Sequence, residues 1–185
     1  MSKYKIGEMK MQKTIKIIRD YVEDTSSSLD TAIMLNGSWG SGKTYFVKKE
    51  LIPALGEEKC VYVSLNGVKS ADEITDRILL SIMGSDAGSE KKLWTSFYKF
   101  AKKADWGTKG NIARDFAFAF SGYLKDITIN RNLKGCLLIV DDLERVSDDL
   151  LIKDVLGFFC THFIEKQKQK IFFICNESEI KDPEY

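Results

Sequence analysis

The order of apolar and amphipathic segments along the chain predicts an α/β fold in which helices cover both faces of a parallel, four-stranded sheet. Segments with helical periodicity separate the strand-like runs, and parallel strands need such crossover connections. The strand-like runs are apolar almost throughout, which is typical of strands buried on both faces. They span residues 30–36, 60–65, 136–140 and 170–175.

The composition is that of one compact domain. The chain has 185 residues, of which 44% are hydrophobic and 30% are charged. Its formal net charge of +1 provides no global basic field for nucleic acid or anionic lipid, so such binding would need a local patch. The only histidine, His162, excludes His-based catalytic triads and two-histidine metal centres built within this chain.

Cysteine spacing and the N-terminus predict a cytoplasmic protein without a membrane partner. No two cysteines have the CxxC spacing. We expect them to behave as small buried hydrophobic residues of a protein in a reducing compartment. The N-terminal segment has no apolar core or cleavage site of a secretory signal. The most apolar run, 116–124, has about half of the ~20 residues needed to span a bilayer. The cysteines are Cys60, Cys136, Cys160 and Cys175.

An amphipathic helix precedes the first strand. Apolar residues recur at helical spacing between Met11 and Val22, which predicts a helix over about residues 8–24. A polar linker, 25–29, follows it. Residues 1–29 therefore form an N-terminal helix and linker.

Turn and capping residues mark the helices on either side of the second strand. A helical stretch follows residue 44 and ends near Leu55, before Gly56. Ser70 and Glu73 have the S-x-x-E spacing of a capping box, which predicts a helix that begins after Ser70.

The second half of the chain is predicted to contain a helical insertion, two strands and one more helix. Residues 85–134 have an irregular helical pattern after a glycine- and serine-rich break. Ser147, together with Asp148 and Asp149, is expected to cap a helix that runs to about Gln167.

The segment GSWGSGKT (37–44) matches the Walker A pattern G-x-x-x-x-G-K-[ST], directly after a predicted strand and before a predicted helix. Its glycines let backbone N–H groups point toward an anion, and the helix start adds a positive dipole end. We expect Lys43 to reach the β- and γ-phosphates and the Thr44 hydroxyl to bind Mg²⁺. The motif predicts binding of ATP with Mg²⁺ through Gly37, Ser38, Trp39, Gly40, Ser41, Gly42, Lys43, Thr44 and Tyr45.

Two carboxylates follow the third predicted strand. Asp141 and Asp142 open the segment Asp-Asp-Leu-Glu-Arg at its carboxyl end. An acidic residue at this position is what a nucleotide site needs for its metal, so Asp141 is the candidate Mg²⁺ residue. Asp142 is the candidate general base that activates the attacking water.

Three further residues each have two interpretations. Asn176 is a candidate sensor for the attacking water or γ-phosphate if the fourth strand lies between the first and third; otherwise it belongs to a turn with Glu177 and Ser178. Arg145 either pairs with an acid on the next helix or faces a phosphate across a subunit boundary. Trp39 either covers apolar surface or meets a partner or ligand.

Three segments together resemble a known family. They are G-x-W-G-S-G-K-T after an apolar strand, D-D-L-[DE]-R after another strand, and VYVSLNGVKSADEI after residue 60. They resemble the KAP-type P-loop NTPases, which are close to the STAND and AAA+ ATPases. The resemblance implies a three-layer sandwich with an insertion between Walker A and Walker B. It also implies that Lys43 and Thr44 bind phosphate and Mg²⁺, that Asp141 is the metal acid and that Asp142 is the hydrolytic acid.

The resemblance also carries expectations about setting and assembly. Many KAP proteins have transmembrane helices between the two motifs, whereas residues 91–130 are charged throughout, which favours a soluble version. Similar proteins occur in bacterial anti-phage systems, often as large oligomers, so a homo-oligomer or a partner protein is expected to complete the site. Such folds usually order their strands 5-1-4-3-2, so that a fifth strand covers the first. Only four strands are predicted here, which leaves the first strand as an exposed edge. We therefore expect the chain to be the N-terminal part of a longer protein, or its first strand to be covered by another chain.

The leading functional hypothesis is an ATPase that powers or switches assembly with partners. One alternative is a scaffold that binds ATP with little hydrolysis. A second alternative is a small-molecule kinase, which the tandem carboxylates Asp141 and Asp142 disfavour. Lysines and aromatic residues gather in 91–109; this density is either a nucleic-acid footprint or, as we favour, a solvated helix face over an aromatic core.

Overall fold

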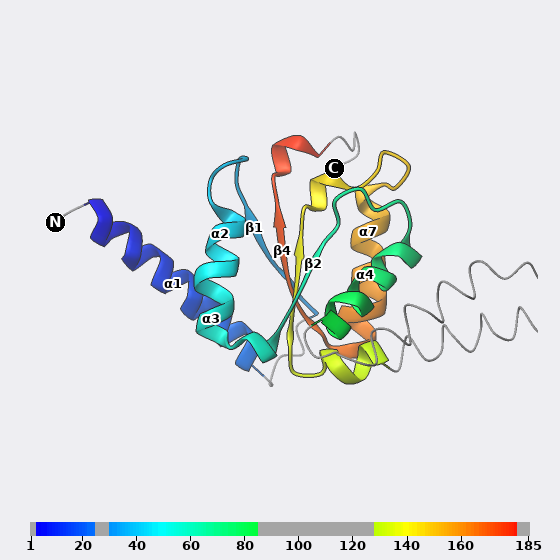
Figure 1. Ribbon diagram of the computed structural model, residues 1–185, viewed down its shortest axis with the longest axis horizontal. Helices are drawn as coiled ribbons and strands as arrows, with labels where there is room; N and C mark the ends of the chain where they lie inside the picture. Colours follow the sequence, from blue (N-terminus) through cyan, green and yellow to red (C-terminus); the bar gives the residue numbers. More distant parts are fainter. Residues whose placement is uncertain (1–2, 25–29, 85–127, 181–185) are drawn as a thin grey trace, which may run out of the picture.

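The computed structural model describes residues 3–24, 30–84 and 128–180 (Figure 1). These residues form a four-stranded parallel sheet in the order β1-β4-β3-β2. The α/β class and the parallel sheet are therefore confirmed, and β4 lies between β1 and β3. The strands are β1 (Ile33–Asn36), β2 (Cys60–Ser64), β3 (Leu137–Asp141) and β4 (Lys170–Cys175).

Two strands differ from their predicted bounds in ways that matter for the site. β1 begins three residues later than predicted, at Ile33. β3 is displaced by one residue, so that Asp141 is its last residue. The β2–β3 register places Ser64 opposite Asp141. Two polar residues thus stand side by side where these neighbouring strands end.

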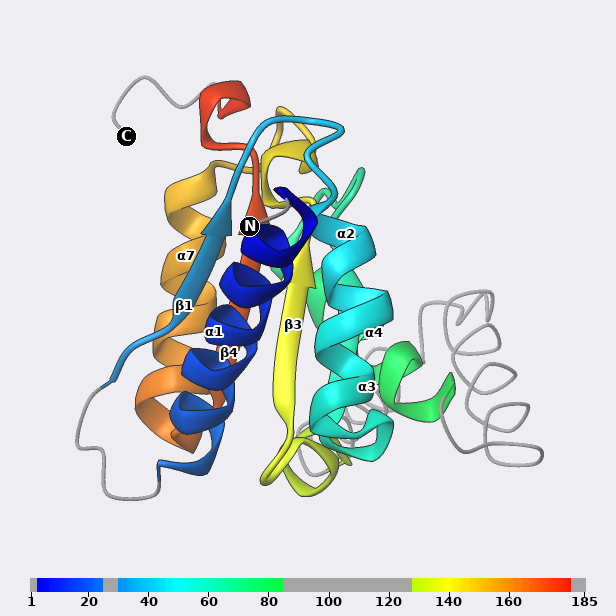
Figure 2. The ribbon, with the colours of Figure 1, turned by 90° about the vertical axis from the view of Figure 1, so that its left-hand side faces the viewer.

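One face of the sheet is covered by α1 (Lys3–Glu23) and by the helix that follows the Walker A segment (Figure 2). That helix continues through α2 (Lys43–Phe46), a π-helical turn (Val47–Leu51) and α3 (Ile52–Leu55). It ends, as predicted, at Gly56, whose φ of 103° is strained for other residues. The buried residues on this face are Ile15, Ile18, Val47, Leu51, Leu137, Ile139, Phe172 and Ile174.

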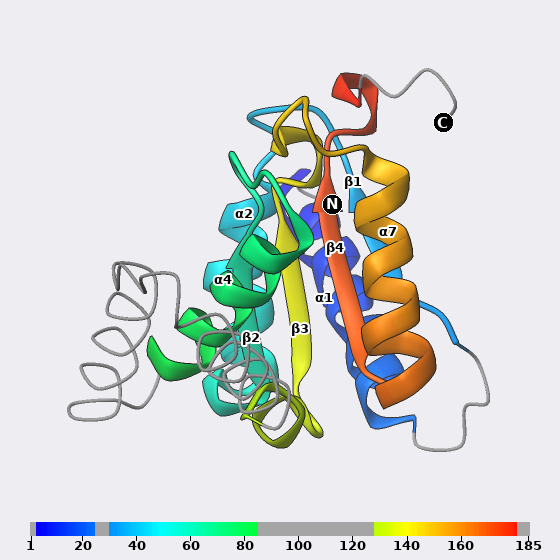
Figure 3. The same cartoon turned by 90° about the vertical axis from the view of Figure 1, so that its right-hand side faces the viewer.

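The opposite face is covered by α4 (Ala71–Gly84), a helix at 128–133 and α7 (Ile152–Phe159) (Figure 3). A π-helical segment, Cys160–Glu165, continues α7. Leu138 and Val140 pack on this face, whereas their neighbours Leu137 and Ile139 pack on the other. This alternation explains why the strand is apolar at every position.

The helix ends follow the capping predictions only in part. The Glu73 N–H donates to Ser70 Oγ at 3.3 Å, so the serine half of the predicted capping box is present. The Glu73 carboxylate accepts from the N–H of Lys69, one residue before the cap, at 3.0 Å. The prediction for Ser147 was wrong: its hydroxyl accepts from the Asp149 N–H within a local turn. α7 begins at Ile152, five residues after Ser147, and no side chain caps it. Three 3₁₀ turns complete the described elements: Glu57–Lys59, Leu143–Arg145 and Glu177–Glu179.

The cysteines are all free thiols, but their predicted burial holds only for Cys175. Cys60, Cys136 and Cys160 are partly exposed because they lie at strand ends or on an outer helix face. Burial still raises the pKa of Cys60 to about 12, so its thiol is protonated at neutral pH and is a poor nucleophile.

Several sequence predictions lie outside the described residues. These are the linker 25–29, most of the insertion 85–134, the basic aromatic segment 91–109 and the apolar run 116–124. Within the part of the chain that the structure describes, no helix is long and apolar enough to cross a membrane.

Candidate nucleotide site

The Walker A segment forms an open loop between β1 and α2. Gly40 and Gly42 have φ angles of 75° and 88°, a region that residues with a Cβ rarely adopt. A Cβ at either glycine would meet nothing within 4 Å. Backbone conformation, rather than crowding, therefore requires glycine here, and the space over the loop is free for a ligand.

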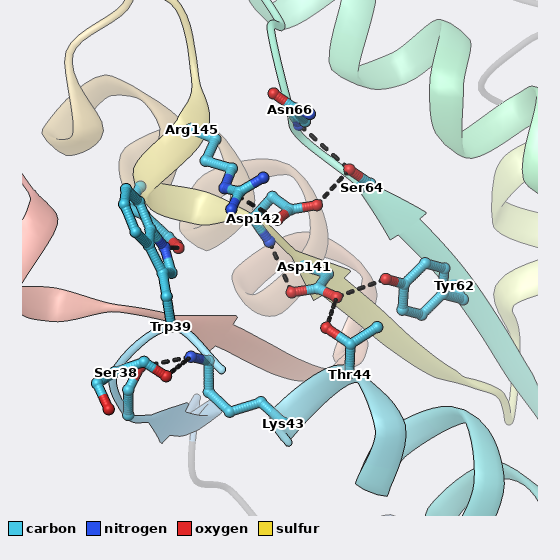
Figure 4. Close-up of polar contacts among 12 residues, drawn as sticks. Ser38, Trp39, Lys43, Thr44, Tyr62, Ser64, Asn66, Asp141, Asp142 and Arg145 are labelled. Carbon is cyan, nitrogen blue, oxygen red and sulfur yellow. Dashed lines mark hydrogen bonds and ion pairs between the residues drawn. The ribbon is translucent and has the colours of Figure 1, made fainter. Parts of the chain in front are cut away.

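Lys43 lies at the start of α2 and folds back over the loop (Figure 4). Its ammonium group donates to the carbonyl oxygens of Gly37 and Ser38, the latter at 3.0 Å. Phosphate oxygens can replace such carbonyl acceptors. No side chain caps the start of α2, so its N–H groups are available to an anion.

Asp141 joins the Walker A helix to the end of β3. Its side chain is buried, and Oδ2 accepts from Thr44 Oγ1 at 3.0 Å and from the Tyr62 hydroxyl at 2.5 Å. Its Oδ1 accepts from the Asp142 N–H at 2.8 Å. These contacts hold the carboxylate at the carboxyl edge of the sheet, beside the hydroxyl that follows Lys43.

Tyr62 is a site residue that the sequence analysis missed. It lies in the middle of β2, and burial together with its hydrogen bond to Asp141 raises the pKa of its hydroxyl. The hydroxyl therefore stays protonated and remains a donor. Its strand pattern gave no sign of this role, because the contact joins residues 79 positions apart.

The donor set suits Mg²⁺ bound together with a nucleotide. Thr44 and Asp141 provide a hydroxyl and a carboxylate oxygen, and Mg²⁺ in nucleotide sites uses one or two protein groups alongside phosphates and water. Among the described residues there is no group of three or more His, Cys, Asp or Glu side chains that could hold a metal. The two oxygen donors held together at Thr44 and Asp141 fit a metal that arrives with phosphate.

Asp142 faces a different set of partners from Asp141. Its backbone is in the left-handed region, with φ of 61°, which turns the chain sharply after the strand. Oδ2 accepts from Ser64 Oγ at 2.7 Å, and Oδ1 lies 3.6 Å from Arg145 Nε (Figure 4). Ser64 is a second residue that the sequence analysis missed.

Arg145 pairs with a neighbouring acid, but not with one on the next helix. Its partner is Asp142, three residues earlier, because the 3₁₀ turn Leu143–Arg145 brings the two side chains to the same side. The prediction of an acid on the following helix was therefore wrong. Arg145 also lies over the ring of Trp39 in the Walker A loop.

The Walker A loop and the segment after β3 together line a cleft of about 270 Å³. The residues lining the cleft are Trp39, Gly40, Ser41, Gly42, Lys43, Thr44, Tyr45, Asp141, Asp142, Glu144 and Arg145.

Asn176 is buried directly after β4, and its Oδ1 accepts from Ser178 Oγ at 2.8 Å. The structure therefore contains the turn with Ser178 that was one interpretation of Asn176. The sensor role of Asn176 stays a prediction.

A parallel sheet with a glycine-rich loop at the carboxyl end of β1, and an acid at the end of β3, defines a nucleotide-binding protein of the P-loop NTPase class. The model of the KAP family P-loop domain matches residues 11–182. The chain therefore belongs to the KAP family of P-loop NTPases. No curated protein matches the chain.

Proposed function

We propose that this domain binds ATP with Mg²⁺ and hydrolyses it. The observation that carries the proposal is the contact of Thr44 Oγ1 with Asp141 Oδ2, which joins residues 97 positions apart at 3.0 Å. It brings the Walker A hydroxyl and the acid of the strand end to one point, at the helix that begins with Lys43. A lone phosphate-binding loop would not need this acid.

The side chains divide the work of phosphoryl transfer among them. Lys43 and the loop N–H groups would bind the phosphates. Thr44 and Asp141 would hold Mg²⁺, which would neutralise charge on the phosphates when bound. Asp142 accepts a proton from the attacking water. Asn176, at the end of the neighbouring strand, contacts that water or the γ-phosphate.

A scaffold that binds ATP with little hydrolysis is the second candidate function. It is favoured by the state of Asp142, since both carboxylate oxygens already have partners, Ser64 and Arg145. A base engaged in this way abstracts a proton poorly until one partner leaves. Coupling of either activity to assembly with partner proteins, and a role in anti-phage defence, remain predictions from family resemblance.

The decisive experiment combines calorimetric ATP binding with steady-state phosphate release for three variants. Lys43→Ala should weaken ATP binding about 10- to 100-fold, because a charged hydrogen-bond donor is lost from a surface loop. Lys49→Ala, an exposed lysine farther along the same helix, is the matched control and should bind normally. Normal ATP affinity in a folded Lys43→Ala variant would overturn the nucleotide assignment.

Asp142→Asn separates hydrolysis from mere binding. For an ATPase, it should keep ATP affinity and lose phosphate release by about 10²- to 10⁴-fold, the usual contribution of a general base. For a scaffold, wild type and Asp142→Asn would both bind ATP and release phosphate at the same low rate.

A further inference from the structure

Trp39 connects the Walker A loop to the segment that follows β3. Trp39 is 55% exposed, which is unusual for the largest apolar residue. The indole N–H donates to Glu144 Oε1 at 3.0 Å, and the Arg145 guanidinium lies 5.2 Å from the ring centroid. Two contacts therefore hold the ring against residues more than 100 positions away along the chain.

Arg145 extends this connection to the candidate base. The same guanidinium group that covers Trp39 lies 3.6 Å from Asp142, so it stands between the loop tryptophan and the carboxylate (Figure 4). Ser64 holds the other carboxylate oxygen from β2. Arg145 thus makes one of the two side-chain contacts that orient Asp142, and Ser64 makes the other.

The contacts that form this connection are suited to rearrangement. The side chains of Arg145 and Asp142 are 44% and 26% exposed, and partly exposed ion pairs and cation–π contacts are individually weak. Glu144 Oε2 is buried without a hydrogen-bond partner among the described residues, so its carboxylate is only half satisfied. A small free-energy difference is enough to shift such an arrangement.

We propose that Trp39 is a positioning residue that couples occupancy of the phosphate loop to the orientation of Asp142, acting through Arg145. Trp39 is part of the loop that binds phosphate, so a change in loop conformation moves the surface on which Arg145 rests. Arg145 then changes its contact with Asp142. The inference rests on the proposed nucleotide function, and it assigns Trp39 a role that covering apolar surface does not include.

Tryptophan fluorescence provides a readout that is independent of turnover. Trp94→Phe and Trp106→Phe leave Trp39 as the sole tryptophan of the three. In this background, a non-hydrolysable ATP analogue with Mg²⁺ should change both the emission of Trp39 and its quenching by acrylamide. Adding Arg145→Gln should reduce that change by about half or more, because the free protein then lacks the cation over the ring.

Calorimetry on the same samples separates the two proposals. Absence of analogue binding in the background protein would overturn the proposed function. Binding without a change in Trp39 emission, or an equal change with and without Arg145→Gln, would overturn the coupling alone. Leu151→Ala, an exposed apolar residue in the neighbouring groove, is the control and should leave the emission change intact.

Turnover provides a second arm if the domain hydrolyses ATP. Trp39→Ala should lower kcat at least about tenfold, a part of the usual general-base contribution, and leave KM within about threefold. Trp39→Phe keeps a ring for Arg145 and should recover most of kcat. A rise in KM alone, or no rescue by phenylalanine, would contradict a positioning role.

Discussion

Asp141 and Asp142 are adjacent in the chain yet have separate environments. Asp141 ends β3, is buried, and receives hydrogen bonds from Thr44 and Tyr62. The left-handed backbone of Asp142 turns its side chain toward Ser64 instead. One carboxylate is thereby fixed beside the Thr44 hydroxyl, while the other contacts Ser64 and Arg145.

Asp141→Ala should make ATP binding insensitive to Mg²⁺, because it removes the only carboxylate in contact with Thr44 among the described residues. The measurement is ATP affinity by calorimetry, with Mg²⁺ and after chelation. We expect chelation to weaken wild type by about tenfold or more, equivalent to ~1.4 kcal/mol, and to leave the variant unchanged.

Tyr62→Phe is the control for that experiment, since it deletes the hydroxyl that contacts Asp141 and keeps the carboxylate. Its Mg²⁺ dependence should persist. If chelation weakened Asp141→Ala as much as wild type, Asp141 would not be the metal residue.

At the scale of elements, α1 is part of the core rather than an appendage. Its apolar stripe packs on the face of the sheet that also carries the Walker A helix, and its Arg19 guanidinium donates to the Ala54 carbonyl at 2.8 Å. The helix after the loop therefore packs against α1 as well as against the sheet. Stability of the site region should depend on this contact.

Ile18→Ala should lower the free energy of unfolding by about 2–5 kcal/mol, because Ile18 is 1% exposed and its removal leaves a cavity against the sheet. Its neighbour Ile17 is 62% exposed, so Ile17→Ala is the matched control and should change stability by no more than about 0.5 kcal/mol. Urea unfolding measures both. Equal effects of the two substitutions would show that α1 does not pack as described.

At the scale of the whole molecule, the arginine that pairs with the candidate base is already engaged within its own chain. Arg145 contacts Asp142 and Trp39. In P-loop enzymes an arginine supplied by a neighbouring subunit contributes roughly 10³ to 10⁵ in rate. We therefore expect this chain to need a partner, or a second copy of itself, for fast hydrolysis.

The 185-residue chain should bind ATP with Mg²⁺ and turn it over slowly at low concentration. Single-turnover hydrolysis at increasing protein concentration measures this, and the rate should rise as copies associate or when a partner is added. Fast turnover that is independent of concentration would mean that one chain holds a complete active site.

Local patterns in the sequence determined much of the fold and the first half of the site. Strand composition, helical spacing and the Walker A motif each depend on residues close together in the chain, so the four strands and the phosphate loop could be predicted from them. The same holds for Asp141, which follows an apolar run directly. The Ser147 cap was predicted wrongly, because a competing turn, Ser147–Asp149, uses the same residues.

Only the tertiary structure decided which side chains meet across the sheet. The register of β2 against β3 sets Ser64 beside Asp141, and β2 also brings the Tyr62 hydroxyl to that carboxylate. The contact of Trp39 with Glu144 likewise joins residues 105 positions apart. Such contacts depend on strand order and register, which arise from packing of the whole core, and no local spacing of residues encodes them.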